Sequence, residues 1–183
     1  MSIAANPHDV LDFWFDENVK PLWFVKKEEF DRQIKEKFMD TYQLAKMGAL
    51  DNWRNNAADL LALIIVFDQF PRNMFRDTAQ AFATDKRAVE LTKYAVDNNY
   101  QSQLTAEQQT FLYMPLMHSE DRQDQNKCVE LFEKLGIAEN LKFAIKHQAV
   151  IDRFGRFPHR NQILGRESTP AEQKFLTQPG SSF

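Results

Sequence analysis

The chain has 183 residues, a formal net charge of −3 and a pI near 5.8, which disfavours a general nucleic-acid binder. Its 16 phenylalanines supply large apolar surface for one core, so we expect a single domain over residues 1–183. With no basic, apolar leader at the start, no bilayer-length apolar run and Cys128 as the one cysteine, we expect a cytoplasmic protein without membrane contact.

Four helices are predicted in the first half of the chain. Asn6 should cap a short helix that begins at Pro7 and runs through residues 8–15. Apolar side chains recur on one helical face between residues 27 and 47, and Gly48 should end that helix. Residues 55–70 are apolar nearly all round, which predicts a central buried helix ended by Pro71. A fourth helix is expected over residues 78–97.

Two more helices are predicted on either side of residue 118. Thr105 and Gln108 form a capping box for residues 106–118, where Pro115 should kink the helix or break it near Phe111. Ser119 is then expected to cap a helix that runs to residue 135.

The last two predicted helices flank the segment IDRFGRFPHRNQILGR, residues 151–166. Residues 140–154 form an amphipathic helix that Gly155 should end. Thr169, Pro170 and Glu172 combine a cap, a proline at the first helical position and a capping-box acid. No run alternates with the period of a strand, so the predicted fold class is all-α, with about eight helices in antiparallel hairpins.

Charge is concentrated in two neighbouring segments. Residues 105–140 contain seven acids and three bases, whereas residues 142–166 contain six bases and one acid. This asymmetry indicates either two segments that attract each other or a localised anion site. Arginines beside phenylalanines can be structural, can bind carboxylate or phosphate, or can hold single-stranded RNA, which the negative net charge makes the weakest alternative.

Asp68 is the second candidate feature, because it lies in the last turn of the predicted buried helix. An anion there is disfavoured by the helix dipole and needs a cationic or donor partner. Arg72, four residues on, and the arginines of residues 153–166 are the candidate partners. A purely structural salt-bridge network is therefore a full alternative to a binding site.

Histidines supply the candidate acid/base groups. His118 precedes Glu120 and follows an apolar helix, and His147 lies among apolar residues within the predicted helix before His159. The usual signatures of a zinc site, a phosphate-binding loop and a nucleophilic serine are missing from the sequence, so we expect no metal and no cofactor.

The motifs LALIIVFDQFPRNMFR, FLYMPLMHSED and RFGRFPHRNQILGRESTPAEQKFL, in this order, resemble a bacterial domain-of-unknown-function family, number nine-two-four. The resemblance covers nearly the whole chain and implies a tetratricopeptide-like helical fold but no activity. The family's signature positions fall on Asp68, Arg72, Asn73, His118, Glu120, His147, Arg153, Arg156, His159, Arg160 and Asn161.

Three functions remain open from the sequence. The leading hypothesis is a pocket where the three motifs converge, in which Arg72, Arg156 and Arg160 hold a small anion or an acidic peptide. Asp68 and Glu120 would orient these arginines. The second is an acid/base enzyme on an anionic substrate, with His118 or His147 as base. The third is a scaffold that binds a partner helix in an apolar groove.

Overall fold

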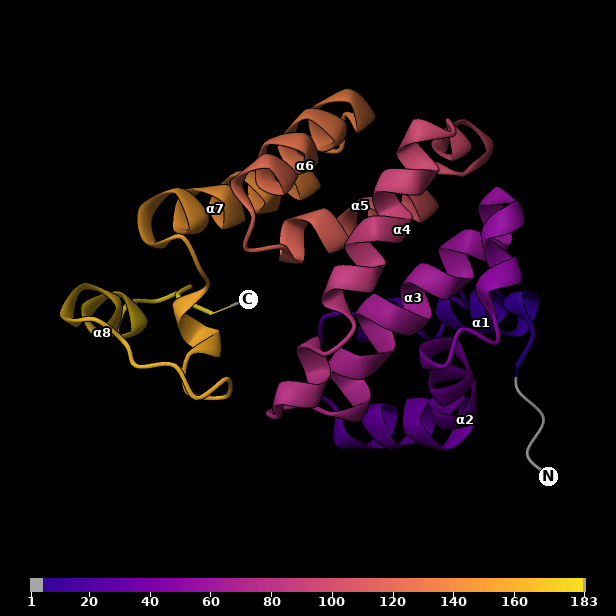
Figure 1. The fold of residues 1–183 in the computed structure, drawn as a ribbon, viewed down its shortest axis with the longest axis horizontal. Coiled ribbons are helices and arrows are strands. Elements are labelled where there is room, and N and C mark those ends of the chain that lie inside the picture. Colours follow the sequence, from indigo (N-terminus) through magenta and orange to yellow (C-terminus); the bar gives the residue numbers. More distant parts are fainter. Residues whose placement is uncertain (1–4, 183) are drawn as a thin grey trace. The chain divides into compact units, whose positions relative to one another are not determined.

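The computed structural model describes residues 5–182, and the regular elements in that range are all helical (Figure 1). The all-α class predicted from the sequence is confirmed. The eight α-helices of the described range are α1 (Pro7–Trp14), α2 (Glu28–Lys46), α3 (Ala57–Met74), α4 (Asp85–Asp97), α5 (Ala106–His118), α6 (Arg122–Leu135), α7 (Ala138–Phe154) and α8 (Pro170–Leu176). Short 3-10 helices connect them: η1 (Lys20–Leu22), η2 (Asp51–Asn55), η3 (Ala79–Phe82), η4 (Tyr100–Gln103) and η5 (Pro158–Arg160).

The internal contacts of the chain divide it into two compact units. Unit 1 combines the chain up to Arg76 with Gln80–Pro115, and unit 2 combines Asp77–Ala79 with the chain from Leu116 onward. The single domain expected from the sequence stays a prediction.

Unit 1 is built around α3, which packs against α1, α2 and α4. Nearly every α3 side chain is buried, as the continuous apolar run predicts. Aromatic rings pack between the helices of unit 1: Phe38 of α2 stacks on Phe70 of α3 at 4.6 Å, and Trp14 of α1 meets Phe111 of α5 edge-on at 5.5 Å. The many phenylalanines of the sequence therefore serve the packing of this core.

Pro71 lies inside α3, and the expectation that it ends the helix is wrong. The helix continues to Met74, and the amide of Phe75 still donates to the carbonyl oxygen of Pro71 at 2.9 Å. Proline removes the N–H that would bond to the carbonyl of Phe67, four residues earlier. The hydroxyl of Thr84 donates to that carbonyl at 2.7 Å instead, so the buried oxygen keeps a partner.

Two helix starts also differ from those predicted. α4 begins at Asp85 rather than near residue 78, because the preceding chain forms η3 and Thr84 is held by its bond to α3. The cap of α6 is Asp121, whose carboxylate accepts from the amides of the two residues after Arg122 at 2.8 and 3.1 Å. Ser119 donates to the carboxylate of Asp124 at 2.7 Å and is not the cap.

The other helix boundaries follow the sequence signals. The capping boxes at Asn6 and Thr169 form, and the Thr105 hydroxyl and Gln108 side chain exchange bonds with each other's backbone amides. The expected alternative of a break near Phe111 is wrong, because α5 continues through Pro115 to His118. Gly155 ends α7 in the left-handed conformation, at φ +71°.

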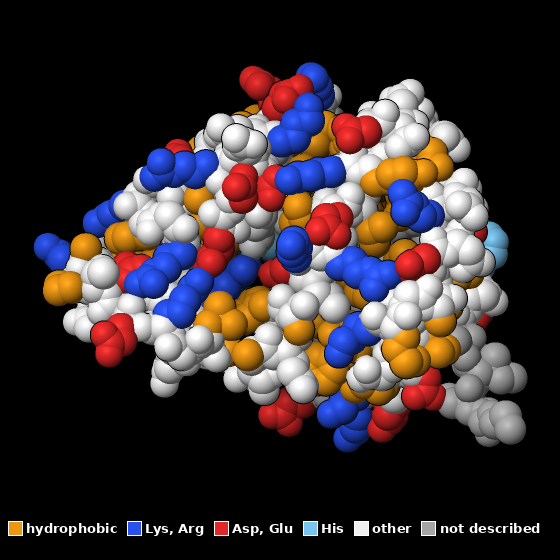
Figure 2. All heavy atoms as spheres, in the orientation of Figure 1, with side chains coloured by type: hydrophobic (Ala, Val, Ile, Leu, Met, Phe, Trp, Pro, Cys, Tyr) orange, Lys and Arg blue, Asp and Glu red, His pale blue; other side chains and the backbone are white. Residues whose placement is uncertain are grey.

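The surface mixes both charge signs. Figure 2 shows Lys and Arg side chains interspersed with Asp and Glu on the face in view. Over residues 5–182, the helices are too short or too polar to cross a membrane.

Candidate functional site

The arginine-rich segment connects α7 to α8 in unit 2. The left-handed Gly155 turns the chain away from α7, and its amide donates to the carbonyl of Ile151 at 2.8 Å. Phe157 then enters the core beside Val150 and Ile151 and is fully buried. A single aromatic anchor between a glycine turn and η5 therefore fixes where the flanking arginines lie.

Arg156 is bound by a carboxylate that the sequence did not indicate as its partner. Its Nε and Nη2 donate to the two oxygens of Glu172 at 2.7 and 2.9 Å, and Nη2 also donates to the Glu167 carbonyl at 2.8 Å. The hydrogen bond from Arg156 lowers the pKa of Glu172 to about 2. Arg156 keeps one terminal donor, Nη1, beyond these bonds.

Arg153, in the last turn of α7, is held by aromatic rings. Its guanidinium lies 4.7 Å from the ring centre of Phe154 and 5.9 Å from that of Phe175. No acceptor in residues 5–182 takes a hydrogen bond from it, and the side chain is exposed. Stacking on the rings orients the planar guanidinium group of Arg153 and leaves its N–H groups available to donate hydrogen bonds to a ligand.

A cavity of about 480 Å³ opens between these two arginines. Its wall is formed by Arg153, Phe154, Arg156, Thr169, Ala171 and Glu172. The lining thus carries two guanidinium groups and one carboxylate, which leaves one positive charge in excess. This is the arrangement that can bind a carboxylate or a phosphate.

Glu120 is paired with Arg166, which the sequence-based set of site residues omitted. The pair is bidentate, at 2.7 and 2.9 Å, and Glu120 also accepts the amide of Phe157 at 2.7 Å. Burial favours the neutral acid, but these bonds outweigh it and lower the pKa of Glu120. Asn161, nearly fully buried, accepts from Arg166 Nε at 2.9 Å and donates to the Ser168 hydroxyl at 3.1 Å.

The histidines of unit 2 gather around Phe157. Ring centres are 6.4 Å apart for His118 and His147, and 5.7 Å from Phe157 to each of His147 and His159. The buried guanidinium of Arg160 covers the Phe157 ring at 4.6 Å and donates to the carbonyl oxygen of His118 at 3.0 Å.

This cluster disfavours protonated imidazoles. Burial, followed by repulsion from His118, Arg160 and His159, lowers the pKa of His147 to about 3. Burial and Arg160 lower the pKa of His159 to about 4. Because a carbonyl can only accept, the 2.8 Å bond between His147 Nδ1 and the Phe143 oxygen places the proton on Nδ1 and leaves Nε2 as an acceptor.

The remaining predicted site residues lie in unit 1, in two charge networks. Arg72 donates to both oxygens of Asp85, at 2.9 and 3.0 Å, and lies 3.2 Å from the buried carboxylate of Asp68. Burial works against its charge, but the two acids outweigh this and raise the pKa of Arg72. Asn73 joins a separate network by donating to Asp31 at 2.8 Å.

The structure therefore divides the eleven predicted residues between the units. Asp68, Arg72 and Asn73 are in unit 1, and the other eight are in unit 2. Their convergence in one pocket stays a prediction. Glu172 and Arg166 were missed as site residues, although the capping-box position of Glu172 marked it as a fixed carboxylate.

Metal binding depends on how candidate ligands are grouped in the described residues, and thiol chemistry depends on the burial of Cys128. Over residues 5–182, no three His, Cys, Asp or Glu side chains are grouped so that they could hold a metal ion. Cys128 is fully buried in α6, and burial raises the pKa of its thiol.

Two comparisons with known proteins match the chain. The family model described as "Bacterial protein of unknown function (DUF924)" matches residues 10–180. A solved structure of a protein of unknown function from Agrobacterium tumefaciens is 38% identical, with a TM-score of 0.88, and the match covers 93% of this chain and 96% of that one. No curated protein matches. The chain belongs to this bacterial family of unknown function.

Proposed function

We propose that the protein binds a small anion, a carboxylate or phosphate compound or the acidic end of a peptide, in the cavity of unit 2 between Arg153 and Arg156. The observation that carries this proposal is the charge of the lining, where one carboxylate faces two guanidinium groups. Glu172 is engaged by Arg156, and Arg153 stacks on phenylalanine rings, so a ligand carboxylate or phosphate would offset the excess charge.

The proposed binding groups differ in part from those expected from the sequence. Arg72 is bidentate on Asp85, and the described hydrogen bond of Arg160 goes to a backbone carbonyl beside the histidines. Arg153 and the Nη1 of Arg156 offer donors at a cavity. Arg153 is the main anion-binding group in this proposal, and Arg156 serves both the ligand and the fold.

The test replaces Arg153 by Gln and measures binding of inorganic phosphate, succinate and a peptide ending in Asp-Glu, by calorimetry and thermal shift. At a hundredfold excess over Kd, a ligand specific for the folded chain stabilises it by about 2.7 kcal/mol. Arg153→Gln should abolish this response. Its own stability should stay within about 0.5 kcal/mol of the wild type, because the side chain is exposed and forms no ion pair with residues 5–182.

Arg122→Gln is the matched control, since Arg122 is an exposed arginine of the same unit that donates to the Asp152 carbonyl at 3.1 Å, outside the cavity. It should bind like the wild type. Equal affinity in Arg153→Gln and Arg122→Gln, or no response to any of the three probes, would show the proposal to be wrong.

An acid/base enzyme is the second candidate, favoured by the 6.4 Å approach of the His118 and His147 rings. A base with a pKa near 3, such as His147, has little driving force for proton abstraction at neutral pH, so in this hypothesis the base is His118.

The partner-helix scaffold, the tetratricopeptide-like architecture and the cytoplasmic location remain predictions from the sequence. Exposed Phe143 and Ile145 on α7 are the observation that favours a scaffold.

A further inference from the structure

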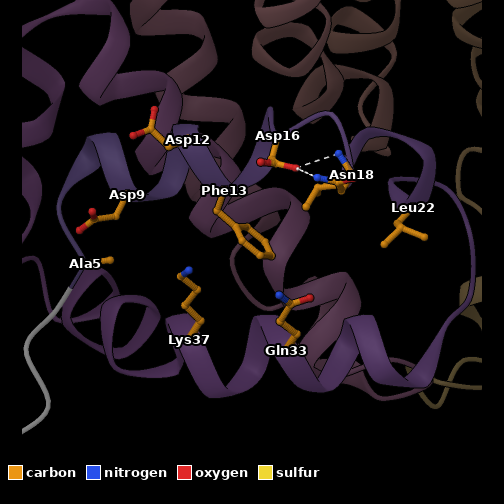
Figure 3. Close-up of a pocket in the computed structure, with 10 residues that line it drawn as sticks. Ala5, Asp9, Asp12, Phe13, Asp16, Asn18, Leu22, Gln33 and Lys37 are labelled. Atoms are coloured by element: carbon orange, nitrogen blue, oxygen red, sulfur yellow. Dashed lines mark hydrogen bonds between the residues drawn. The ribbon is translucent and has the colours of Figure 1, made fainter.

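Unit 1 contains a larger cavity that the proposed anion site does not use. Its volume is about 920 Å³, and it lies between α1, α2 and the segment that follows α1 (Figure 3). Its apolar wall includes Phe13, Val19 and Leu22. Phe13 and Val19 are more than nine-tenths buried, so packing fixes their positions, and each shows the cavity a small part of its side chain.

An alkylammonium group already lies in this cavity. Lys37 extends from α2 toward Phe13 (Figure 3), and its Nζ is 5.3 Å from the centre of that ring. This contact is a cation–π interaction between a primary ammonium and the cavity wall. Lys37 is itself exposed, so the contact forms on a surface that solutes can reach.

The rest of the charged lining is acidic. Asp9 and Asp16 are held by backbone amides: Asp9 accepts from Asn6 at 2.9 Å, and Asp16 accepts from Asn18 at 2.8 Å. Asp12 is exposed and takes no hydrogen bond from the described residues. Asp16 also follows the carboxyl end of α1, where the helix dipole adds negative potential.

The three acids and one lysine leave the lining with two negative charges in excess, on either side of apolar side chains. A metal ion would meet a poor site, since no metal-binding group of acids is found over residues 5–182. An alkylammonium ion matches both the apolar wall and the negative charge of the cavity. Its hydrocarbon part covers the apolar wall, and its ammonium groups pair with the carboxylates.

We propose that this cavity binds a linear aliphatic diamine, with one ammonium at Asp12 and the other near Asp16, and with its methylene chain against Phe13 and Val19. The ammonium of Lys37 is its internal competitor. The proposal is independent of the anion site, because its residues all belong to unit 1.

Calorimetric titration of the full chain with 1,4-diaminobutane at low ionic strength tests this proposal. Saturable binding is expected. Asp12→Asn should weaken it by up to about fivefold, the upper limit for one exposed ion pair. Lys37→Gln should tighten binding, because it removes the competing ammonium and its charge. The two substitutions act in opposite directions, which a general loss of folding could not produce.

Asp40→Asn is the matched control, since Asp40 is an exposed acid on α2 that does not line the cavity. It should bind 1,4-diaminobutane like the wild type. Three results would overturn the proposal: no saturable binding, equal affinities of Asp12→Asn and Asp40→Asn, or an equal Asp12-dependent response to magnesium chloride. Butylamine binding as tightly as the diamine would overturn the two-ended recognition.

Discussion

Glu172 shows how one side chain serves a helix end and an ion pair together. Its carboxylate accepts the amide of Thr169 at 2.7 Å, as a capping box requires, and holds Arg156 through two further bonds. α8 has only seven residues, too few to be stable by propensity alone. Its formation therefore depends on this carboxylate and on the packing of Phe175 beside the core of unit 2.

Glu172→Gln should lower the unfolding free energy at pH 7 by about 1 kcal/mol, since Arg156 is partly exposed and the ion pair is screened. The folded-state pKa of about 2 lies below the ordinary value of 4.5, so the stabilisation is complete above pH 4.5 and is lost as pH falls toward 2. Thermal unfolding measured from pH 7 to 2 should show the two proteins converging.

Glu167→Gln provides the control for this substitution. Glu167 meets Arg156 through its backbone carbonyl, and its side chain is exposed. Its stability should follow that of the wild type at every pH. A constant stability difference between Glu172→Gln and the wild type down to pH 2 would contradict the assigned ion pair.

At the scale of elements, α3 shows how a buried helix accommodates an internal proline. Pro71 removes one backbone donor, and the hydroxyl of Thr84, at the start of α4, supplies the replacement. The sequence showed the proline but not the hydroxyl, because the two are joined only by the packing of α4 on α3. A hydrogen-bond donor from another element thus allows α3 to continue through a proline, which disfavours helical geometry in the residue before it.

Thr84→Val should destabilise the protein by about 1–3 kcal/mol, because it leaves the buried Phe67 carbonyl without its donor. Pro71→Ala restores a backbone N–H for the same carbonyl. In that background Thr84→Val should cost about 1 kcal/mol less, which a double-mutant cycle of denaturant unfolding measures. Equal costs in the two backgrounds would show that Thr84 does not replace the missing donor.

At the scale of the whole molecule, two histidines of unit 2, buried His147 and half-buried His159, add to the destabilisation by acid. Their pKa values in the folded chain, about 3 for His147 and about 4 for His159, lie below the ordinary 6.5. At pH values between the folded-state pKa and the ordinary pKa of each histidine, the unfolded chain binds more protons than the folded chain does. The contribution of these histidines to the unfolding free energy is therefore constant above pH 6.5 and falls as pH decreases toward 3.

Each histidine should contribute a slope approaching about 1.4 kcal/mol per pH unit in this range. His147→Gln should remove one such contribution, measured as the unfolding free energy from pH 8 to 4. His8→Gln is the control, because His8 is exposed in the first turn of α1. An unchanged slope in His147→Gln would contradict the burial of a neutral imidazole.

Local signals predicted most of the fold, whereas the partners of the charged residues depended on packing. The cap at Thr169 and the stop at Gly155 are visible in a few neighbouring residues, and both form. The pair of Arg156 with Glu172 joins positions 16 apart, and that of Arg166 with Glu120 joins positions 46 apart. No periodicity encodes such pairings, so the sequence located the arginines and named Asp68 and Glu120 as candidate acids, but it did not show that Glu172 binds Arg156 or that Arg166 binds Glu120.

Cys128 gives the molecule a further property. The chain has one thiol, which is fully buried and has a raised pKa. It therefore cannot react with reagents in solution while α6 stays packed. A thiol reagent can react only as fast as this packing opens. The rate at which Cys128 reacts with such a reagent therefore measures how often the packing around α6 opens, and no cysteine has to be introduced for this measurement.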